Sequence, residues 1–189
     1  MLIIGCLLAP CAIKTDRLGL HMLRNTAHFT GQNLWFLAVA FIPFSQLFAL
    51  EFSTPVWVAL LAPLFLGEVL TRRRLLSVVI GFSGVLIVAR PDLNDLNPAI
   101  LAAMACAICF ACSLMATKKL TIDQSITCIL FWLTLMQLGM GVAAVALTGS
   151  VSMPQGIDYI WVVTVGIGGL TAHFCITKAL ALAPAIVVI

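Results

Sequence analysis

Charged residues are scarce in this sequence. Lys, Arg, Asp and Glu together make up 9% of its 189 residues, whereas hydrophobic residues make up 62%. A soluble domain of this length covers its surface with polar groups, and so few charges cannot do that. The shortage therefore excludes a soluble globular protein. The lack of a basic face with interleaved aromatic residues excludes nucleic-acid binding.

Catalytic and metal-binding motifs are also missing. The sequence has no HExxH pair, only one clear acidic residue within an apolar run, and no second ligand four residues from His28. We therefore expect no enzymatic activity, no metal site and no cofactor. Cys106, Cys109 and Cys112 have the spacing of iron–sulfur ligands. Because their neighbours are apolar and no fourth ligand is evident, they are interpreted as packing residues.

What the sequence has instead is a series of apolar runs separated by short polar segments. The predicted membrane-spanning helices cover residues 25–42, 44–67, 75–89, 98–117, 126–148 and 159–183. Residues 1–13 are interpreted as the end of a further helix and the residues from Ala185 onward as the start of another, so the chain looks truncated at both ends. The expected fold class is all-α, a polytopic transmembrane helix bundle.

The run from Phe44 to Gly67 is the element on which the functional interpretation rests. At 1.5 Å per residue, its 24 residues would reach roughly 36 Å, enough to cross a bilayer with some tilt. The run contains one carboxylate, Glu51, and two prolines, Pro55 and Pro63. A charge in mid-span costs about 2.5–3.5 kcal/mol on insertion scales, and proline kinks a helix. These residues predict a bent spanning helix with a polar interior.

The distribution of basic residues predicts an orientation. If the loop Lys14–Arg24 is cytoplasmic and the predicted spans alternate, nine of the ten Lys and Arg residues lie at cytoplasmic loops or helix ends, and only Arg90 lies outside. Such a bias is the positive-inside pattern of membrane proteins. We therefore expect Arg72–Arg74 and Lys118–Asp123 to face the cytoplasm, and Asp92–Asn97 to face outward.

Several motifs resemble a known family. The stretches Glu51–Pro55, Leu66–Glu68, Gly81–Val85 and Ala89–Pro91 resemble the fourth and fifth helices of EamA-type transporters of the drug/metabolite transporter superfamily. The resemblance implies ten helices in an inverted repeat of two five-helix units around a central cavity. It further implies that residues 1–91 run from the end of helix 2 to helix 5 of the first repeat. Residues 97–189 would run from helix 6 to the start of helix 9 in the second repeat.

This resemblance implies a secondary transporter that moves a small metabolite or drug-like solute across the bacterial cytoplasmic (inner) membrane by alternating access. The expected partners are the lipid bilayer, the solute, protons and a second copy of the chain in a homodimer. The alternative is a membrane structural or interaction protein, or a fragment that does not transport. That alternative would show no substrate-dependent flux in reconstituted vesicles.

Placing 100° between residues puts Glu51 on the same helix face as Leu47, Thr54, Pro55, Val58 and Ala62. Glu51 is expected to carry a proton or to contact a cationic group of the solute, with Lys178 as a candidate partner. A purely structural role, hydrogen bonding to a neighbouring helix, stays open for Glu51 and for the polar residues of 25–42. The residues predicted to line the solute pathway are Glu51, Thr54, Pro55, Gln32, Trp35, His173 and Lys178.

Overall fold

The computed structural model describes residues 13, 16–89, 97–149 and 153–188, and every regular element in these ranges is a helix. This confirms the predicted all-α bundle. Residues 1–12 and most of the predicted linker between the two repeats lie outside the described residues. In chain order the helices are α2 (Leu18–Val39), α3 (Phe44–Glu51), α4 (Thr54–Leu66), α5 (Arg72–Ala89), α6 (Pro98–Leu120), α7 (Ile126–Thr148), α8 (Asp158–Leu182) and α9 (Ala185–Val188).

Four helical stretches are long and apolar enough to cross a membrane. They are Phe44–Leu66, which combines α3 and α4, and the single helices α6, α7 and α8. Two predicted spans, in α2 and α5, are not among these four. Helix α2 carries polar side chains along its length, and the eighteen residues of α5 include three arginines.

The boundaries of α2 and α5 correct two predicted loops. The arginines expected in a hairpin form the first turn of α5, where the backbone N–H of Arg74 donates to Thr71 Oγ1 (3.4 Å). Helix α2 begins at Leu18, so most of the predicted loop Lys14–Arg24 is helical. The side of this segment that packs inward carries His21, Arg24 and Asn25, whereas Leu18, Met22 and Leu23 are exposed, so the count of charges alone did not reveal the helix.

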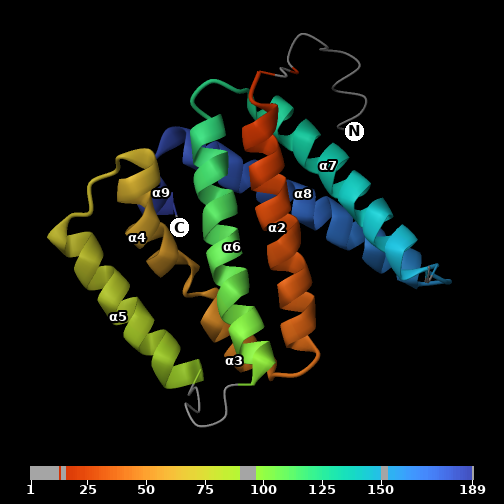
Figure 1. Cartoon of the computed structure of the whole chain (residues 1–189), viewed down its shortest axis with the longest axis horizontal. Helices are drawn as coiled ribbons and strands as arrows, with labels where there is room; N and C mark the ends of the chain where they lie inside the picture. The colour runs from red at the N-terminus through yellow and green to blue at the C-terminus, as the bar shows by residue number, and fades with distance from the viewer. Residues whose placement is uncertain (1–12, 14–15, 90–96, 150–152, 189) are drawn as a thin grey trace.

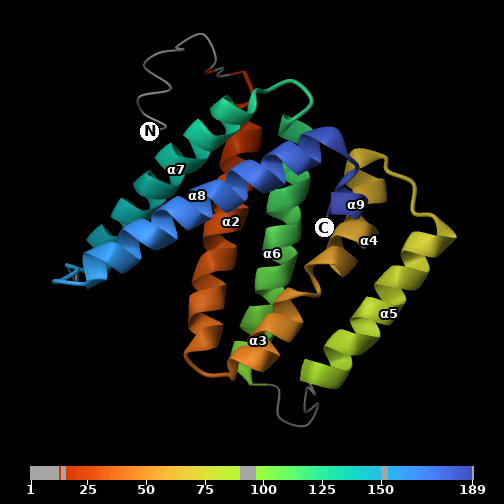
Figure 2. The ribbon, with the colours of Figure 1, turned by 180° about the vertical axis from the view of Figure 1, so that it is seen from behind.

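Helix α6 lies at the centre of the bundle and packs against α2, α3, α4, α8 and α9. Half of its buried residues are alanines, which let neighbouring backbones approach. The closest approach is to α2, where a Cβ added to Gly31 would lie 2.8 Å from the Phe110 ring and 3.3 Å from Cβ of Cys109. Figures 1 and 2 both show α2 and α6 side by side.

The helices alternate in direction. Arg17 before α2 pairs with Asp123 after α6 (2.6 Å), and Gln46 at the start of α3 donates to the carbonyl of Ala89 at the end of α5 (2.8 Å). The turn between α2 and α3 and the turn between α8 and α9 therefore lie at opposite ends of the bundle, as Figure 1 shows. This agrees with the predicted alternation, which places Pro43 and Pro184 at opposite ends.

The turn between α8 and α9 is held by two charged side chains. Glu68, in the loop after α4, accepts hydrogen bonds from the backbone N–H groups of Ala185 (2.7 Å) and Ile186 (3.2 Å). Lys118 of α6 donates to the carbonyls of Leu180 (2.6 Å) and Ala183 (2.8 Å). The carboxylate thus satisfies the free donors at a helix start and the ammonium satisfies the free acceptors at a helix end.

The outer helices expose apolar side chains. Within α8 the buried residues are Thr177 and Leu180, both near its C-terminal end. Figure 2 shows α8 crossing α2 and α6 diagonally on the outside of the bundle. Leu64, Leu147 and Leu182 are about 80% or more exposed, at 79%, 89% and 80%. Continuous apolar surface of this kind suits lipid rather than water.

Candidate functional site

A cavity of about 490 Å³ lies between α2, the α3–α4 break, α6 and the C-terminal part of α8. Four of the seven residues predicted for the solute pathway, Glu51, Thr54, Pro55 and His173, line it together. They come from two regions of the chain more than a hundred residues apart, and the fold brings them to one place. The polar side chains of the lining are those of Arg24, His28, Glu51, Thr54, Ser113, Thr117 and His173.

The bend predicted for residues 44–67 is a break at Phe52 and Ser53, between α3 and α4. Pro55 has no N–H to donate to the carbonyl of Glu51 four residues earlier, so a continuous helix would leave that carbonyl without a partner. The hydroxyl of Thr54 fills the gap: its Oγ1 donates to the Glu51 carbonyl at 2.6 Å and lies 3.5 Å from the Ala107 carbonyl of α6. Pro55 therefore breaks the helix in the middle of a membrane-length segment, and Thr54 supplies the hydrogen bond that the proline cannot donate.

The carboxylate of Glu51 is half-buried at the end of α3. Its Oε2 accepts a hydrogen bond of 2.8 Å from Nε1 of Trp35, a residue of α2. Trp35 was predicted to line the pathway; it does not line the cavity, but it bonds to Glu51, which does. The indole fixes one carboxylate oxygen, and Glu51 still contributes to the cavity wall.

The opposite wall of the cavity is cationic. Arg24 of α2 is 2% exposed, and its guanidinium contacts three polar atoms: Thr117 Oγ1 (3.2 Å from Nε), Asn25 Oδ1 (2.8 Å) and His173 Nδ1 (3.4 Å). The His173 ring meets the ring of His28 edge-on, with centroids 4.8 Å apart. Three nitrogen-rich side chains from α2 and α8 therefore gather at one end of the cavity.

Three predicted pathway residues, Gln32, Trp35 and Lys178, do not line this cavity. Gln32 and Lys178 are both exposed, and neither belongs to its lining. Lys178 is not paired with Glu51, because the one ion pair within the described ranges joins Arg17 and Asp123. Lys178 is five residues after His173, so at about 100° per residue it lies on a different face of α8.

Sequence reasoning missed four polar lining residues: Arg24, His28, Ser113 and Thr117. Arg24 was assigned to a cytoplasmic loop, because a basic residue beside an apolar run is usually a flanking charge. His28 was placed at the end of a span, although α2 begins ten residues earlier. A helical pattern of polar residues at 21, 24, 25 and 28 was the available signal, since these positions share one face.

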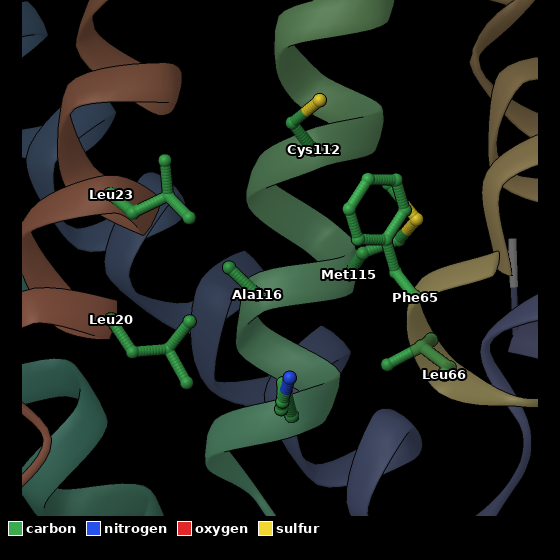
Figure 3. Close-up of a pocket in the computed structure, with 8 residues that line it drawn as sticks. Leu20, Leu23, Phe65, Leu66, Cys112, Met115 and Ala116 are labelled. Carbon is green, nitrogen blue, oxygen red and sulfur yellow. The ribbon is translucent and has the colours of Figure 1, made fainter.

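A second cavity, of about 250 Å³, is almost wholly apolar (Figure 3). Leu20 and Leu23 of α2, Met115 and Ala116 of α6, and Phe65 of α4 border it. With Lys119 as its one charged lining residue, it offers little that could orient a polar solute.

The cysteines form no disulfide among the described residues. None of Cys106, Cys109, Cys112, Cys128 and Cys175 is disulfide-bonded. Within the residues that the structure describes, no group of three or more His, Cys, Asp or Glu side chains is arranged to hold a metal ion.

Comparisons with known proteins agree with the motifs. The EamA-like transporter family matches residues 2–90. An S-adenosylmethionine uptake transporter of Rickettsia prowazekii is 28% identical over 151 residues, which are 80% of this chain and 47% of that protein. A riboflavin transporter of Brucella anthropi is 31% identical over 163 residues, 85% of this chain and 57% of that protein. A riboflavin transporter of Vibrio cholerae is 29% identical over 177 residues, 92% of this chain and 58% of that protein.

The chain spans about half the length of the curated relatives it matches. No solved structure matches it. The matched family and these relatives are named as transporters. Together with its apolar helices they make the protein an integral, multi-pass membrane protein. Residues 2–90 match the EamA-like transporter family, in agreement with the motifs that resemble it.

Proposed function

We propose that this chain forms part of a secondary transporter that moves a small metabolite across a bacterial cytoplasmic membrane by alternating access. The observation that carries the proposal is the polar cavity at the break between α3 and α4. Broken helices at membrane depth are tolerated where they line a cavity, and transporters place their solutes at such breaks. The cavity of about 490 Å³ has the size of a small-molecule site.

Glu51 is proposed to line the solute pathway, where it carries a proton or contacts a cationic group of the solute. Support comes from its place at the break and from the hydrogen bond that orients one of its oxygens toward Trp35. An ionisable group inside a membrane segment is costly and is commonly retained for transport. Thr54, Pro55 and His173 share the same cavity and are proposed as pathway residues with it.

The first solutes to test are those that the relatives' names provide, S-adenosylmethionine and riboflavin. The protein would be reconstituted into proteoliposomes, and the uptake of each radiolabelled solute would be measured with and without a pH gradient. The wild-type protein is expected to take up one of these two solutes. Glu51→Gln should lower that flux at least about tenfold, or make it independent of the pH gradient, while the protein still inserts.

Asp158→Asn provides a matched control, because it also removes one carboxylate but lies at the start of α8, outside the cavity lining. Its flux should equal that of the wild type. Unchanged flux and unchanged pH dependence in Glu51→Gln would contradict the role of Glu51. Absence of flux in the wild type would favour the alternative, a membrane protein with a structural or interaction role.

The two parts of the chain, residues 1–91 and 97–189, are proposed to belong to inverted repeats. Support comes from the two turns that follow α2 and α8, because each contains a proline and they lie at opposite ends of the bundle. Repeats with an odd number of crossings are upside down relative to each other. Superposing residues 27–67 on 168–189 and the helices beside them should require a rotation of about 180° about an axis in the membrane plane. An experimental structure of the protein with its neighbouring helices would test this.

A further inference from the structure

We propose that Arg24 and His173 form a subsite for an oxyanion, the carboxylate or phosphate group of the solute that the cavity binds. The inference rests on the proposed transport function and adds a substrate class to it. The proposed role of Glu51 explains why a carboxylate lines the cavity, but it does not explain why the buried guanidinium of Arg24 lines it too. The proposal follows from the charge balance, the unused hydrogen-bond donors and the position of Arg24.

The charge of Arg24 has no acidic partner among the described residues. Glu51 accepts from Trp35, Glu68 binds the start of α9, and Asp123 pairs with Arg17. The guanidinium, which stays positively charged at neutral pH, is 2% exposed and contacts only neutral acceptors. A buried charge without a counter-ion is strongly unfavourable, and an anion entering the cavity would relieve that cost.

The guanidinium also has N–H groups that its present contacts do not use. Of its five N–H groups, three point at Thr117, Asn25 and His173. These contacts fix the plane of the guanidinium and leave one N–H on each terminal nitrogen. A donor on each terminal nitrogen can serve the two oxygens of a carboxylate or phosphate, which is the two-point recognition that distinguishes arginine from lysine.

His173 adds a third donor. The guanidinium can only donate, so Nδ1 of His173, 3.4 Å away, is the acceptor in their contact. The proton of the neutral ring is then on Nε2, which can donate to the same oxyanion. The His28 ring packs edge-on against His173 and lines the same cavity, so it restricts how far that ring can turn.

The placement of Arg24 opposite Glu51 defines the class of solute further. Both side chains line one cavity, yet they form no ion pair, so their charged atoms are more than 4.0 Å apart. Two opposite charges that are held apart inside one cavity favour a dipolar solute, with its oxyanion at Arg24 and its cationic or hydrogen-bond-donating group at Glu51.

The test measures binding rather than flux, so that its failure is distinct from failure of the transport proposal. Fluorine NMR would follow 4-fluorobenzoate, 4-fluorophenyl phosphate and 4-fluorobenzamide titrated into the purified chain in detergent micelles. The benzamide differs from the benzoate only in its uncharged head group. At least one of the anions should bind about tenfold more tightly than the benzamide, and the order of the two anions tells which oxyanion fits.

Arg24→Gln should bring the affinities for the anions and the benzamide within about twofold of each other. Arg72→Gln makes the same change of net charge on an exposed side chain and should keep the wild-type preference. Thr117→Val keeps the side-chain shape but removes the acceptor that orients Nε of Arg24, so it should weaken the preference several-fold even if Arg24→Gln does not fold. A wild-type chain without a preference for either anion, including one that binds no probe, overturns the proposal. An equal loss of preference in Arg72→Gln also overturns it.

Discussion

The indole nitrogen of Trp35 donates a hydrogen bond of 2.8 Å to Oε2 of Glu51. The bond joins the C-terminal part of α2 to the last residue of α3, immediately before the break that borders the cavity. It therefore couples the position of α2 to the shape of the broken helix. Movement at the break must either carry α2 with it or give up this contact.

Replacing Trp35 with Phe keeps an aromatic ring and removes the donor. The hydrogen bond to a half-buried carboxylate should be worth about 1 kcal/mol, so the free energy of unfolding in mixed micelles should fall by that amount. Chemical unfolding followed by circular dichroism would measure it. Trp161→Phe is the control, because Trp161 is 63% exposed on α8. Equal stability of the two variants would mean that the bond contributes nothing.

Gly31 should tolerate no side chain while Phe110 stays in place. A Cβ at this position would lie 2.8 Å from the ring of Phe110, so Gly31→Ala must shift the ring. We expect a loss of about 1–3 kcal/mol of stability from overpacking, measured by the same unfolding assay. The second substitution Phe110→Leu in the Gly31→Ala background should recover part of it.

The matched control for Gly31 is Gly139 in α7, where an added Cβ would meet nothing within 4 Å. Gly139→Ala should leave stability unchanged or raise it by about 0.5–1 kcal/mol, because alanine is the better helix former. A loss at Gly139 equal to that at Gly31 would show that the contact between α2 and α6 is not the cause.

Glu68→Ala should free the start of α9. Both carboxylate oxygens accept backbone N–H groups there, from Ala185 and Ile186. Without them, hydrogen exchange at these two amides should speed up at least about tenfold, as measured by mass spectrometry of the C-terminal peptide. Asp158→Ala removes a carboxylate at the far end of α8 and should leave that peptide unchanged. Slow exchange in Glu68→Ala would show that the side chain does not hold the turn.

The orientation in the membrane can be measured with single cysteines in a background without the native ones. Arg73→Cys and Lys119→Cys should resist an impermeant maleimide on intact cells, because the positive-inside pattern places both in the cytoplasm. Gln155→Cys, between α7 and α8, should react, since it lies at the opposite end of the bundle. All three positions are exposed in the structure. Labelling at 73 or 119 before permeabilisation would reverse the orientation.

Element positions were predictable from the sequence because membrane helices carry a strong compositional signal. The span predicted at 126–148 coincides with α7, and the span predicted at 159–183 is displaced by one residue from α8. The break near Glu51 was foreseeable from Pro55, whose missing N–H leaves a carbonyl free in any continuous helix. These features depend on local chemistry alone.

The site was only partly predictable, because its other half depends on packing between distant helices. Arg24 looks like a flanking charge until α6 and α8 are placed beside it and cover it. Lys178 looked like a partner for Glu51 because both are ionisable groups in apolar runs. Its actual direction is set by the contacts of α8 with α6 and α7, which no sequence spacing records. Composition identified which side chains are costly to place in a membrane, but not which of them come together in the fold.

Helix α8 is buried only near its C-terminal end, where Lys118 also holds its last carbonyls. A helix that is held at one end can pivot about that end. A helix of 25 residues is roughly 37 Å long, so a turn of about 10° at the held end would move the far end by roughly 6 Å. His173, about two turns from the held end, would move by only roughly 2 Å under the same rotation. Spin-label distances to α6 should therefore spread more widely from position 160 than from 176. Such a pivot would let the pathway open widely at one side of the membrane while His173, beside Arg24, stays almost in place.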